Sequence, residues 1–227
     1  MSLSCLKNVK RNGTNKRPDP PSKTYAVYII DRSGSMSPCK NSLIQGYNSF
    51  LEEQNNTDSS ENLFLTTILF NGSYKIKGDL HTSIDKVKYA DPKEFYCGGR
   101  TALYDSVGKA IELLEEIQET NTNPYDKYMI IIMTDGFDNS SKKYSKYDIK
   151  SKVKKHSDWS ITFLAANQDA KHVGSQMGIN ENSCADFIPT PLGLTSLSRA
   201  ISNTVTRFRS GELPQLTADD LKTLKIG

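Results

Sequence analysis

The chain has 227 residues, a length at which one domain of about 100 to 200 residues with tails beside it is the default expectation. Its formal net charge of +3 and its pI near 8.5 are only mildly basic, and its Lys and Arg residues do not form the dense stripe that is typical of nucleic-acid-binding domains. Composition therefore argues against a nucleic-acid partner and identifies no other partner by itself.

The four cysteines are predicted to be free thiols. Cys5, Cys39, Cys97 and Cys184 form no CxxC pair, and the three histidines lie far from them, so the spacing of a structural zinc site is absent. No stretch reaches the ~20 apolar residues of a membrane span, and the first residues lack the apolar core of a secretory signal. We therefore expect a cytoplasmic protein that does not bind membranes.

The composition changes near both ends of the chain. Residues 1–22 are polar, basic and interrupted by proline and glycine, which predicts a flexible basic arm. The folded domain is expected over residues 23–210, followed by a C-terminal tail over residues 211–227. Within that tail the pattern allows a short helix capped by Thr217, with two aspartates near its N-terminal end.

The first half of the domain reads as strand, loop, helix and hairpin. Residues 24–30 are almost continuously apolar, as expected of a buried parallel strand, and the run ends at Asp31. Apolar residues recur at helical spacing between Leu43 and Leu51. A second strand over residues 62–70 leads through Asn71-Gly72, a strong hairpin signal, into a third, antiparallel edge strand that starts at Tyr74 and ends at Lys77.

The second half alternates helices and strands. A helix is expected to begin at Thr101 and to end before Pro124, and the buried strand over residues 128–133 is followed by Thr134-Asp135-Gly136. Further elements are predicted over residues 147–156 (helix), 160–165 (strand), 170–177 (helix), 185–188 (strand) and 192–208 (helix). This alternation predicts an α/β fold: a doubly wound, mostly parallel central sheet with one antiparallel edge strand and helices on both faces.

Five oxygen-bearing side chains fall on loops at the predicted carboxyl ends of strands or at a helix start: Asp31, Ser33, Ser35, Thr101 and Asp135. In an open doubly wound sheet these loops meet in one crevice, where ligands usually bind. Two carboxylates and three hydroxyls are a hard-oxygen set that suits Mg²⁺, with Mn²⁺ or Ca²⁺ as alternatives. Since alternate residues of an extended loop point the same way, both serines are expected to face one ion.

Three motifs carry a resemblance to a known family. The run Asp31-Arg-Ser33-Gly-Ser35, the Thr101 that follows Gly98-Gly99-Arg100, and Thr134-Asp135-Gly136 resemble the three parts of the metal-ion-dependent adhesion site, or MIDAS, of von Willebrand factor A (vWA) domains. The three parts stand in the right order, and the resemblance covers about residues 24–210. It implies a Rossmann-like vWA fold.

The same resemblance assigns roles to the five residues. It implies that Ser33, Ser35 and Thr101 ligate the cation directly or nearly so, while Asp31 and Asp135 act largely through water. It also implies that the open coordination position takes a Glu or Asp carboxylate from a protein partner. Neutral hydroxyls leave a divalent cation incompletely satisfied, which favours an added carboxylate.

Each of these residues also has an ordinary structural reading when it is taken alone. Asp135 is then a helix cap or a turn former, Ser33 and Ser35 are turn residues, and Thr101 is an N-cap. It is their convergence in one crevice that favours a functional reading.

Residues that flank the motifs are not expected to be ligands. Arg32 and Arg100 either pair with an incoming carboxylate or remain solvated. Asp105 and Asp138 are predicted as residues of a helix surface and a loop, with hydrogen bonding to the metal ligands as the alternative.

The histidines and the lysine-rich segment give no catalytic signal. His81, His156 and His172 show no pairing with a Ser or an Asp, so they are expected on the surface, and Trp159 is expected in the core. The seven lysines between residues 142 and 155 are expected to form a solvated face.

These features favour a divalent-metal-dependent protein-protein interaction module, and not an enzyme, within an intracellular complex. The alternatives are an Mg²⁺-dependent hydrolase or phosphoryl-transfer enzyme, or a regulatory subunit of an ATPase or ubiquitin-ligase assembly. The sequence contains no GxxxxGK[ST] phosphate loop, no GxSxG elbow and no positioned general base.

Overall fold

The computed structural model describes residues 22–58, 60–212 and 215–225. The predicted basic arm lies outside these residues except for Ser22. None of the helices within these residues combines the length and the hydropathy that a membrane span requires.

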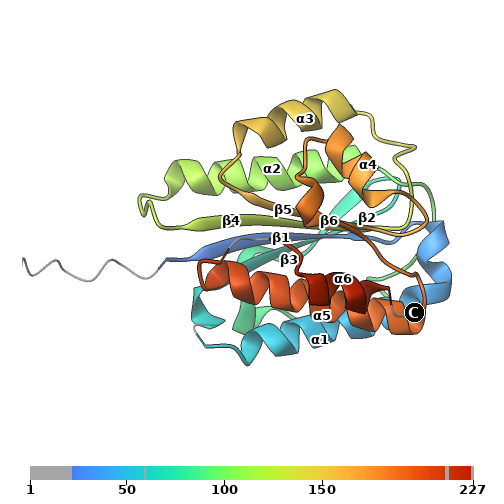
Figure 1. Cartoon of the computed structure of the whole chain (residues 1–227), viewed down its shortest axis with the longest axis horizontal. Coiled ribbons are helices and arrows are strands. Elements are labelled where there is room, and N and C mark those ends of the chain that lie inside the picture. The colour runs from blue at the N-terminus through green and yellow to red at the C-terminus, as the bar shows by residue number, and fades with distance from the viewer. Residues whose placement is uncertain (1–21, 59, 213–214, 226–227) are drawn as a thin grey trace, which may run out of the picture.

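One six-stranded sheet forms the centre of the molecule, with the strand order β3-β2-β1-β4-β5-β6 (Figure 1). The neighbouring pairs are parallel except for β2 and β3, which are antiparallel and place β3 at the edge. The bounds are β1 Thr24–Asp31, β2 Leu63–Phe70, β3 Tyr74–Ser83, β4 Lys127–Thr134, β5 Ser160–Ala165 and β6 Cys184–Asp186. The predicted mostly parallel sheet with an antiparallel edge strand is confirmed.

Helices cover both faces of the sheet (Figure 1). Helices α1, α5 and α6 lie on one face, and α2, α3 and α4 lie on the other. The bounds are α1 Lys40–Asn55, α2 Leu103–Thr120, α3 Lys146–Lys155, α4 Ala170–Gln176, α5 Pro191–Arg209 and α6 Ala218–Leu224. Because β1 and β4 are buried by helices on both sides, their sequences are nearly continuous apolar runs.

The strand order places a topological switch point at β1. The chain passes from β1 through α1 to β2 on one side, and later returns through α2 to β4 on the other side. Ligands bind at such points, in the crevice outside the carboxyl ends of the strands. The carboxyl end of β1 is Asp31, and β1 pairs with β4 so that Ile30 lies opposite Met133.

The edge strand is longer than the sequence predicts. The prediction ended it at Lys77 and treated the next residues as irregular, whereas β3 continues to Ser83. The pairing with β2 shifts register between Leu65 and Thr67. Gly78 and His81, with φ of 71° and 47°, lie in the left-handed region within this stretch. This irregularity interrupts the period-two pattern on which a strand prediction depends.

The segment designated as the C-terminal tail packs onto the domain. Leu216 and Leu224 are buried within the same core as α1 and α5. Thr217 and Asp220 form a reciprocal capping box at the start of α6, as the short-helix reading of this segment predicted. Asp220 is buried and accepts a hydrogen bond of 2.6 Å from Arg207 Nη2, which ties α6 to α5.

His156 is buried, so its predicted surface position is wrong. Its ring stacks on Trp159 at 3.8 Å between centroids, and its Nε2 lies 2.8 Å from Glu115 Oε1. Lys155 and Lys152 also donate to Glu115, at 3.0 and 3.2 Å. Burial raises the pKa of Glu115, but the hydrogen bonds from His156, Lys155 and Lys152 outweigh it and hold that pKa at about 2.

Replacing Glu115 by Gln is expected to lower the free energy of unfolding at pH 7 by about 1 kcal/mol, since ion pairs with partly exposed lysines are screened by water. The pKa of Glu115 is lowered in the fold, so its contribution is fully present above its unfolded pKa near 4.3 and is lost as the pH falls through about 2. Urea unfolding of both proteins at a series of pH values measures this. Equal stability at pH 7 would contradict the assignment.

Candidate metal centre

Asp31 stands at the end of β1 and is completely buried. Its Oδ1 accepts a hydrogen bond of 2.7 Å from the backbone N–H of Ser33, and its Oδ2 accepts one of 2.6 Å from Thr134 Oγ1. The carboxylate is therefore held in one orientation by the turn that follows it and by the end of the neighbouring strand β4.

The two serines lie together, as predicted, although the backbone that carries them is not simply extended. Ser33 has an extended conformation, and Ser35 belongs to a short 3-10 helix, Gly34–Cys39. Their hydroxyl oxygens are 3.1 Å apart. Ser35 Oγ donates to Asp135 Oδ1 at 2.6 Å, which joins the loop after β1 to the loop after β4.

Thr101 approaches the same place from the start of α2. A methyl group on Gly136, the residue after Asp135, would lie 3.5 Å from Thr101 Oγ1, so this hydroxyl faces the loop after β4. Helix α2 begins at Leu103 with Ala102 as its N-cap, and no side chain caps it. The N-cap reading of Thr101 is therefore wrong, and its hydroxyl makes no hydrogen bond within the residues that the structure describes.

The loop before Thr101 is fastened to the serine loop. The N–H of Gly34 donates to the carbonyl of Gly99 at 3.2 Å, and the N–H of Gly98 donates to the carbonyl of Arg32 at 2.9 Å. Gly99 has a φ of 82°, a conformation that favours glycine. Together with the Ser35–Asp135 hydrogen bond, these backbone contacts bring the three loops that carry the five predicted site residues to one place at the carboxyl ends of β1 and β4.

The two carboxylates are unfavourably placed in the absence of a cation. Burial raises the pKa of Asp31 to about 6, although hydrogen bonds from Thr134 and Ser33 lower it, and the nearby charge of Asp135 raises it further. Burial also raises the pKa of Asp135. In the described residues neither carboxylate has a Lys, Arg or His partner. A bound divalent cation would supply the missing positive charge.

Thr134 is a residue of this site that the sequence reasoning missed. Besides donating to Asp31, its Oγ1 accepts a hydrogen bond of 3.2 Å from the N–H of Gly136. It thereby links the carboxylate at the end of β1 to the turn that carries Asp135. The signal was available, because Thr134 and Asp31 both end apolar strands that pair in register.

Asp105 and Asp138 anchor the loop after β4 and do not contact the five site residues. The carboxylate of Asp105 accepts hydrogen bonds of 2.9 Å from the N–H groups of residues 142, 143 and 144. Asp138 Oδ1 accepts from Ser141 Oγ at 2.5 Å and from the N–H of Tyr104 at 3.3 Å. These contacts agree with the prediction that Asp105 and Asp138 are residues of a helix surface and a loop, and not with the alternative that they hydrogen-bond to the metal ligands.

The donor set suits a hard cation. No group of three or more His, Cys, Asp or Glu side chains that could hold a metal occurs in the described residues. Cys39 is buried, its thiol donates to the carbonyl of Pro189 at 2.9 Å, and burial raises its pKa, which favours the neutral thiol. Two carboxylates with three hydroxyls fit Mg²⁺, Mn²⁺ or Ca²⁺.

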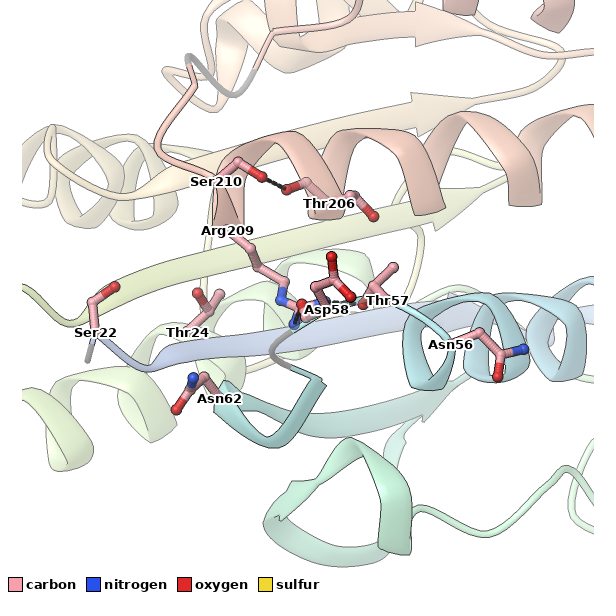
Figure 2. Close-up of a pocket in the computed structure, with 9 residues that line it drawn as sticks. All are labelled: Ser22, Thr24, Asn56, Thr57, Asp58, Asn62, Thr206, Arg209 and Ser210. Atoms are coloured by element: carbon pink, nitrogen blue, oxygen red, sulfur yellow. Dashed lines mark hydrogen bonds between the residues drawn. The ribbon is translucent and has the colours of Figure 1, made fainter.

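A separate cavity of about 620 Å³ lies at the other end of the sheet, where β1 begins and α5 ends (Figure 2). Arg209 points into this region and donates to Thr57 Oγ1 at 2.6 Å and to the carbonyl of Asp58 at 3.3 Å (Figure 2). It also donates to Gln54 Oε1 at 3.2 Å. The guanidinium thus holds the loop after α1 against the end of α5. This cavity lies at the start of β1, whereas Asp31 stands at the end of that strand.

Comparison with known proteins identifies the fold. No protein-family model matches the sequence, and neither does any curated protein. Among solved structures, proximal thread matrix protein 1 from the mussel byssus, in a form with a zinc-occupied MIDAS motif, is similar with a TM-score of 0.59 and 16% identity. The similarity covers 81% of this chain and 48% of that protein.

Two further structures agree with this result. A von Willebrand factor type A protein from Catenulispora acidiphila is similar with a TM-score of 0.54 and 16% identity, over 81% of this chain and 42% of that one. The pilus adhesin SpaC from Lactobacillus rhamnosus GG is similar with a TM-score of 0.61 and 12% identity, over 82% of this chain and 30% of that one. The chain therefore has the Rossmann-like fold of vWA domains, and it spans less than half the length of these similar proteins.

Proposed function

We propose that this chain is a divalent-metal-dependent protein-protein interaction module of the vWA type. The observation that supports it most is the pair of buried carboxylates, Asp31 and Asp135, which converge with three hydroxyls and have no basic partner among the described residues. In this proposal Ser33, Ser35 and Thr101 hold the cation, and the two aspartates orient the hydroxyls and bound water.

Mg²⁺ is the cation that we propose. It prefers oxygen ligands, is usually bound through one or two carboxylates, and usually keeps several waters in its coordination shell. Mn²⁺ and Ca²⁺ accept similar oxygen sets, so they are expected to substitute for it. The MIDAS motif of the byssus protein holds zinc, which supports a divalent ion in general.

The partner is proposed to be a protein that supplies a Glu or Asp carboxylate to the cation. The cation provides the attraction, and the exposed loops around it provide specificity. We propose no catalytic role, because both carboxylates of the site are engaged by hydrogen bonds and by the cation, so neither serves as a general base. Nucleic acid and membranes are not proposed as partners.

The cytoplasmic location within an intracellular complex also remains a proposal. Cys39, Cys97 and Cys184 are free, which agrees with a reducing compartment. Two of the similar structures are a pilus adhesin and a byssus matrix protein, so the likeness of fold does not favour the cytoplasm.

A pull-down tests the proposed function. The immobilised chain is expected to retain a partner in Mg²⁺ and to release it in EDTA, and the variant with Ser33→Ala and Ser35→Ala is expected to retain none, because it lacks two of the hydroxyls that hold the cation. Ser37→Ala is the control, since Ser37 is exposed on the 3-10 helix that also carries Ser35 and lies outside the site. Retention that is equal in Mg²⁺ and EDTA would contradict the proposal.

A further inference from the structure

An open cavity of about 460 Å³ lies directly beside the proposed metal centre. Three segments surround it: the hairpin between β2 and β3, the residue before Thr101, and the loop after β4. The lining residues are Gly72, Arg100, Asn139, Ser140, Ser141 and Lys142.

The cavity is connected to the metal centre through short hydrogen bonds. Asn139 pairs with Thr101 in both directions: its N–H donates to the carbonyl of Thr101 at 2.9 Å, and its Oδ1 accepts from the N–H of Thr101 at 2.9 Å. On the other side, the N–H of Ala102 donates to the carbonyl of Asn71 at 2.6 Å, next to Gly72. A wall of the cavity and a proposed metal ligand are therefore held as one rigid unit.

The cavity presents two cationic side chains that form no ion pair within the described part of the chain. Arg100 and Lys142 are both exposed, and neither side chain forms an ion pair or a hydrogen bond within the described residues. The adjacent Lys143 differs, because it forms an ion pair of 2.6 Å with Glu112. The hydroxyl of Ser140 is buried at the cavity wall and has no hydrogen-bond partner in the described structure.

We infer that this cavity is a second subsite of the proposed metal centre and that it binds a second carboxylate of the same partner. The inference rests on the proposed function. The first carboxylate completes the coordination of the cation, and the second contacts the Arg100 guanidinium and the Lys142 ammonium, with the Ser140 hydroxyl as an additional donor. Guanidinium groups bind carboxylates through paired hydrogen bonds, which gives geometric as well as electrostatic selection.

The arrangement also indicates the spacing of the two acidic residues. In an extended segment, alternate side chains lie on the same side, about 6.5 to 7 Å apart. Arg100 directly precedes Thr101, so its flexible side chain can meet a carboxylate at that separation from the cation. The recognised segment is therefore an extended acidic stretch of the form Glu/Asp-x-Glu/Asp.

Selection from a phage-displayed library of random peptides tests this inference. The full chain is immobilised in MgCl₂, and bound phage are eluted with EDTA, so that only metal-dependent binders are recovered. Peptides with two acidic residues at this spacing are expected to be enriched. A selected peptide is then synthesised with both acidic residues, and again with either one replaced by its amide.

The double variant Arg100→Gln/Lys142→Gln is expected to bind the doubly acidic peptide about tenfold or more weakly, while its Mg²⁺ affinity is unchanged and its affinity for the peptide with one acid is nearly unchanged. Lys23→Gln/Lys154→Gln removes the same charge at two exposed lysines, one just before β1 and one near the end of α3, and is the matched control. Calorimetry measures both the metal and the peptides. Circular dichroism checks that each variant is folded.

Three results would overturn the inference, and they distinguish a failure of the second subsite from a failure of the proposed function. If EDTA-eluted peptides carry only one acidic residue, or if the double variant binds the doubly acidic peptide as the control does, the second subsite is wrong and the metal centre stands. If no peptide depends on the metal, the proposed function fails, and the inference fails with it.

Discussion

Replacing Asp31 by Ala is expected to abolish Mg²⁺ binding while the domain remains folded. Asp31 is the carboxylate that meets both the serine loop, through the N–H of Ser33, and the end of β4, through Thr134 Oγ1. Without it, the site keeps the negative charge of Asp135 alone, and both of these donors lose their acceptor. A loss of at least about 100-fold in Mg²⁺ affinity follows, at the upper end of what groups around a metal contribute.

The fold is expected to survive this change for a specific reason. The Asp31 side chain is completely buried, and burial raises its pKa to about 6, so in the metal-free protein the charge that it carries at pH 7 lowers the free energy of unfolding. A raised carboxyl pKa means that this group destabilises the fold above that pH and ceases to do so as the pH falls toward its unfolded pKa near 3.9. Alanine removes the buried charge, which raises the free energy of unfolding, and it also removes two hydrogen bonds, which lowers it. The two effects therefore oppose each other.

Calorimetry and thermal unfolding together measure the outcome. The wild-type chain is expected to bind Mg²⁺ and to unfold at a higher temperature in its presence, because a ligand that binds only the native state stabilises it. Asp31→Ala is expected to show neither effect and to unfold near the temperature of the metal-free wild type. Asp158→Ala provides the charge-matched control, because Asp158 is an exposed aspartate just before the start of β5, whereas Asp31 stands at the end of β1. Normal Mg²⁺ binding by Asp31→Ala would refute the assignment.

Replacing Thr134 by Val is expected to weaken Mg²⁺ binding by about 10- to 100-fold, although Thr134 is not a proposed ligand. Valine keeps the shape of the side chain and removes the hydroxyl that donates to Asp31 at 2.6 Å. The buried carboxylate then loses a charge-assisted hydrogen bond, and the free energy of unfolding is expected to fall by about 1 to 3 kcal/mol. The N–H of Gly136 also loses an acceptor.

Thr134→Ser separates the hydroxyl from the rest of the side chain. Serine retains the hydroxyl that donates to Asp31, so the Mg²⁺ affinity of the serine variant is expected to stay within a few-fold of the wild type. The valine variant is expected to bind Mg²⁺ about 10- to 100-fold more weakly than the wild type. Titration of Mg²⁺ into the three proteins by calorimetry gives the comparison. If valine and threonine bind Mg²⁺ equally well, the hydroxyl does not orient Asp31 and the role given to it is wrong.

Much of the fold is encoded in local patterns. The apolar runs that became β1 and β4 are long and unbroken because both faces of these strands are covered, and the Asn71-Gly72 signal produced the antiparallel edge strand as predicted. The convergence of the five site residues followed from topology, since each stands at a strand end or helix start. The predicted arrangement of strands was therefore sufficient to predict that these residues lie close together.

The features that the sequence did not reveal depend on distant partners or unusual backbone. His156 looked exposed within a lysine-rich segment, and its burial depends on Glu115, 41 residues away. Gly78 and His81 interrupt the pattern of β3 through left-handed backbone conformations. Thr134 stood in the third motif without a role of its own, because its hydrogen bond to Asp31 appears only when β4 is paired with β1.

The most direct test of the central claim is a crystal structure of the chain grown with MnCl₂, with an anomalous difference map calculated at a wavelength where manganese scatters strongly. We predict a single strong peak at about 2.0 to 2.3 Å from the hydroxyl oxygens of Ser33, Ser35 or Thr101, with the carboxylates of Asp31 and Asp135 around it. A map with no peak there, or with manganese bound only elsewhere on the surface, would contradict the account.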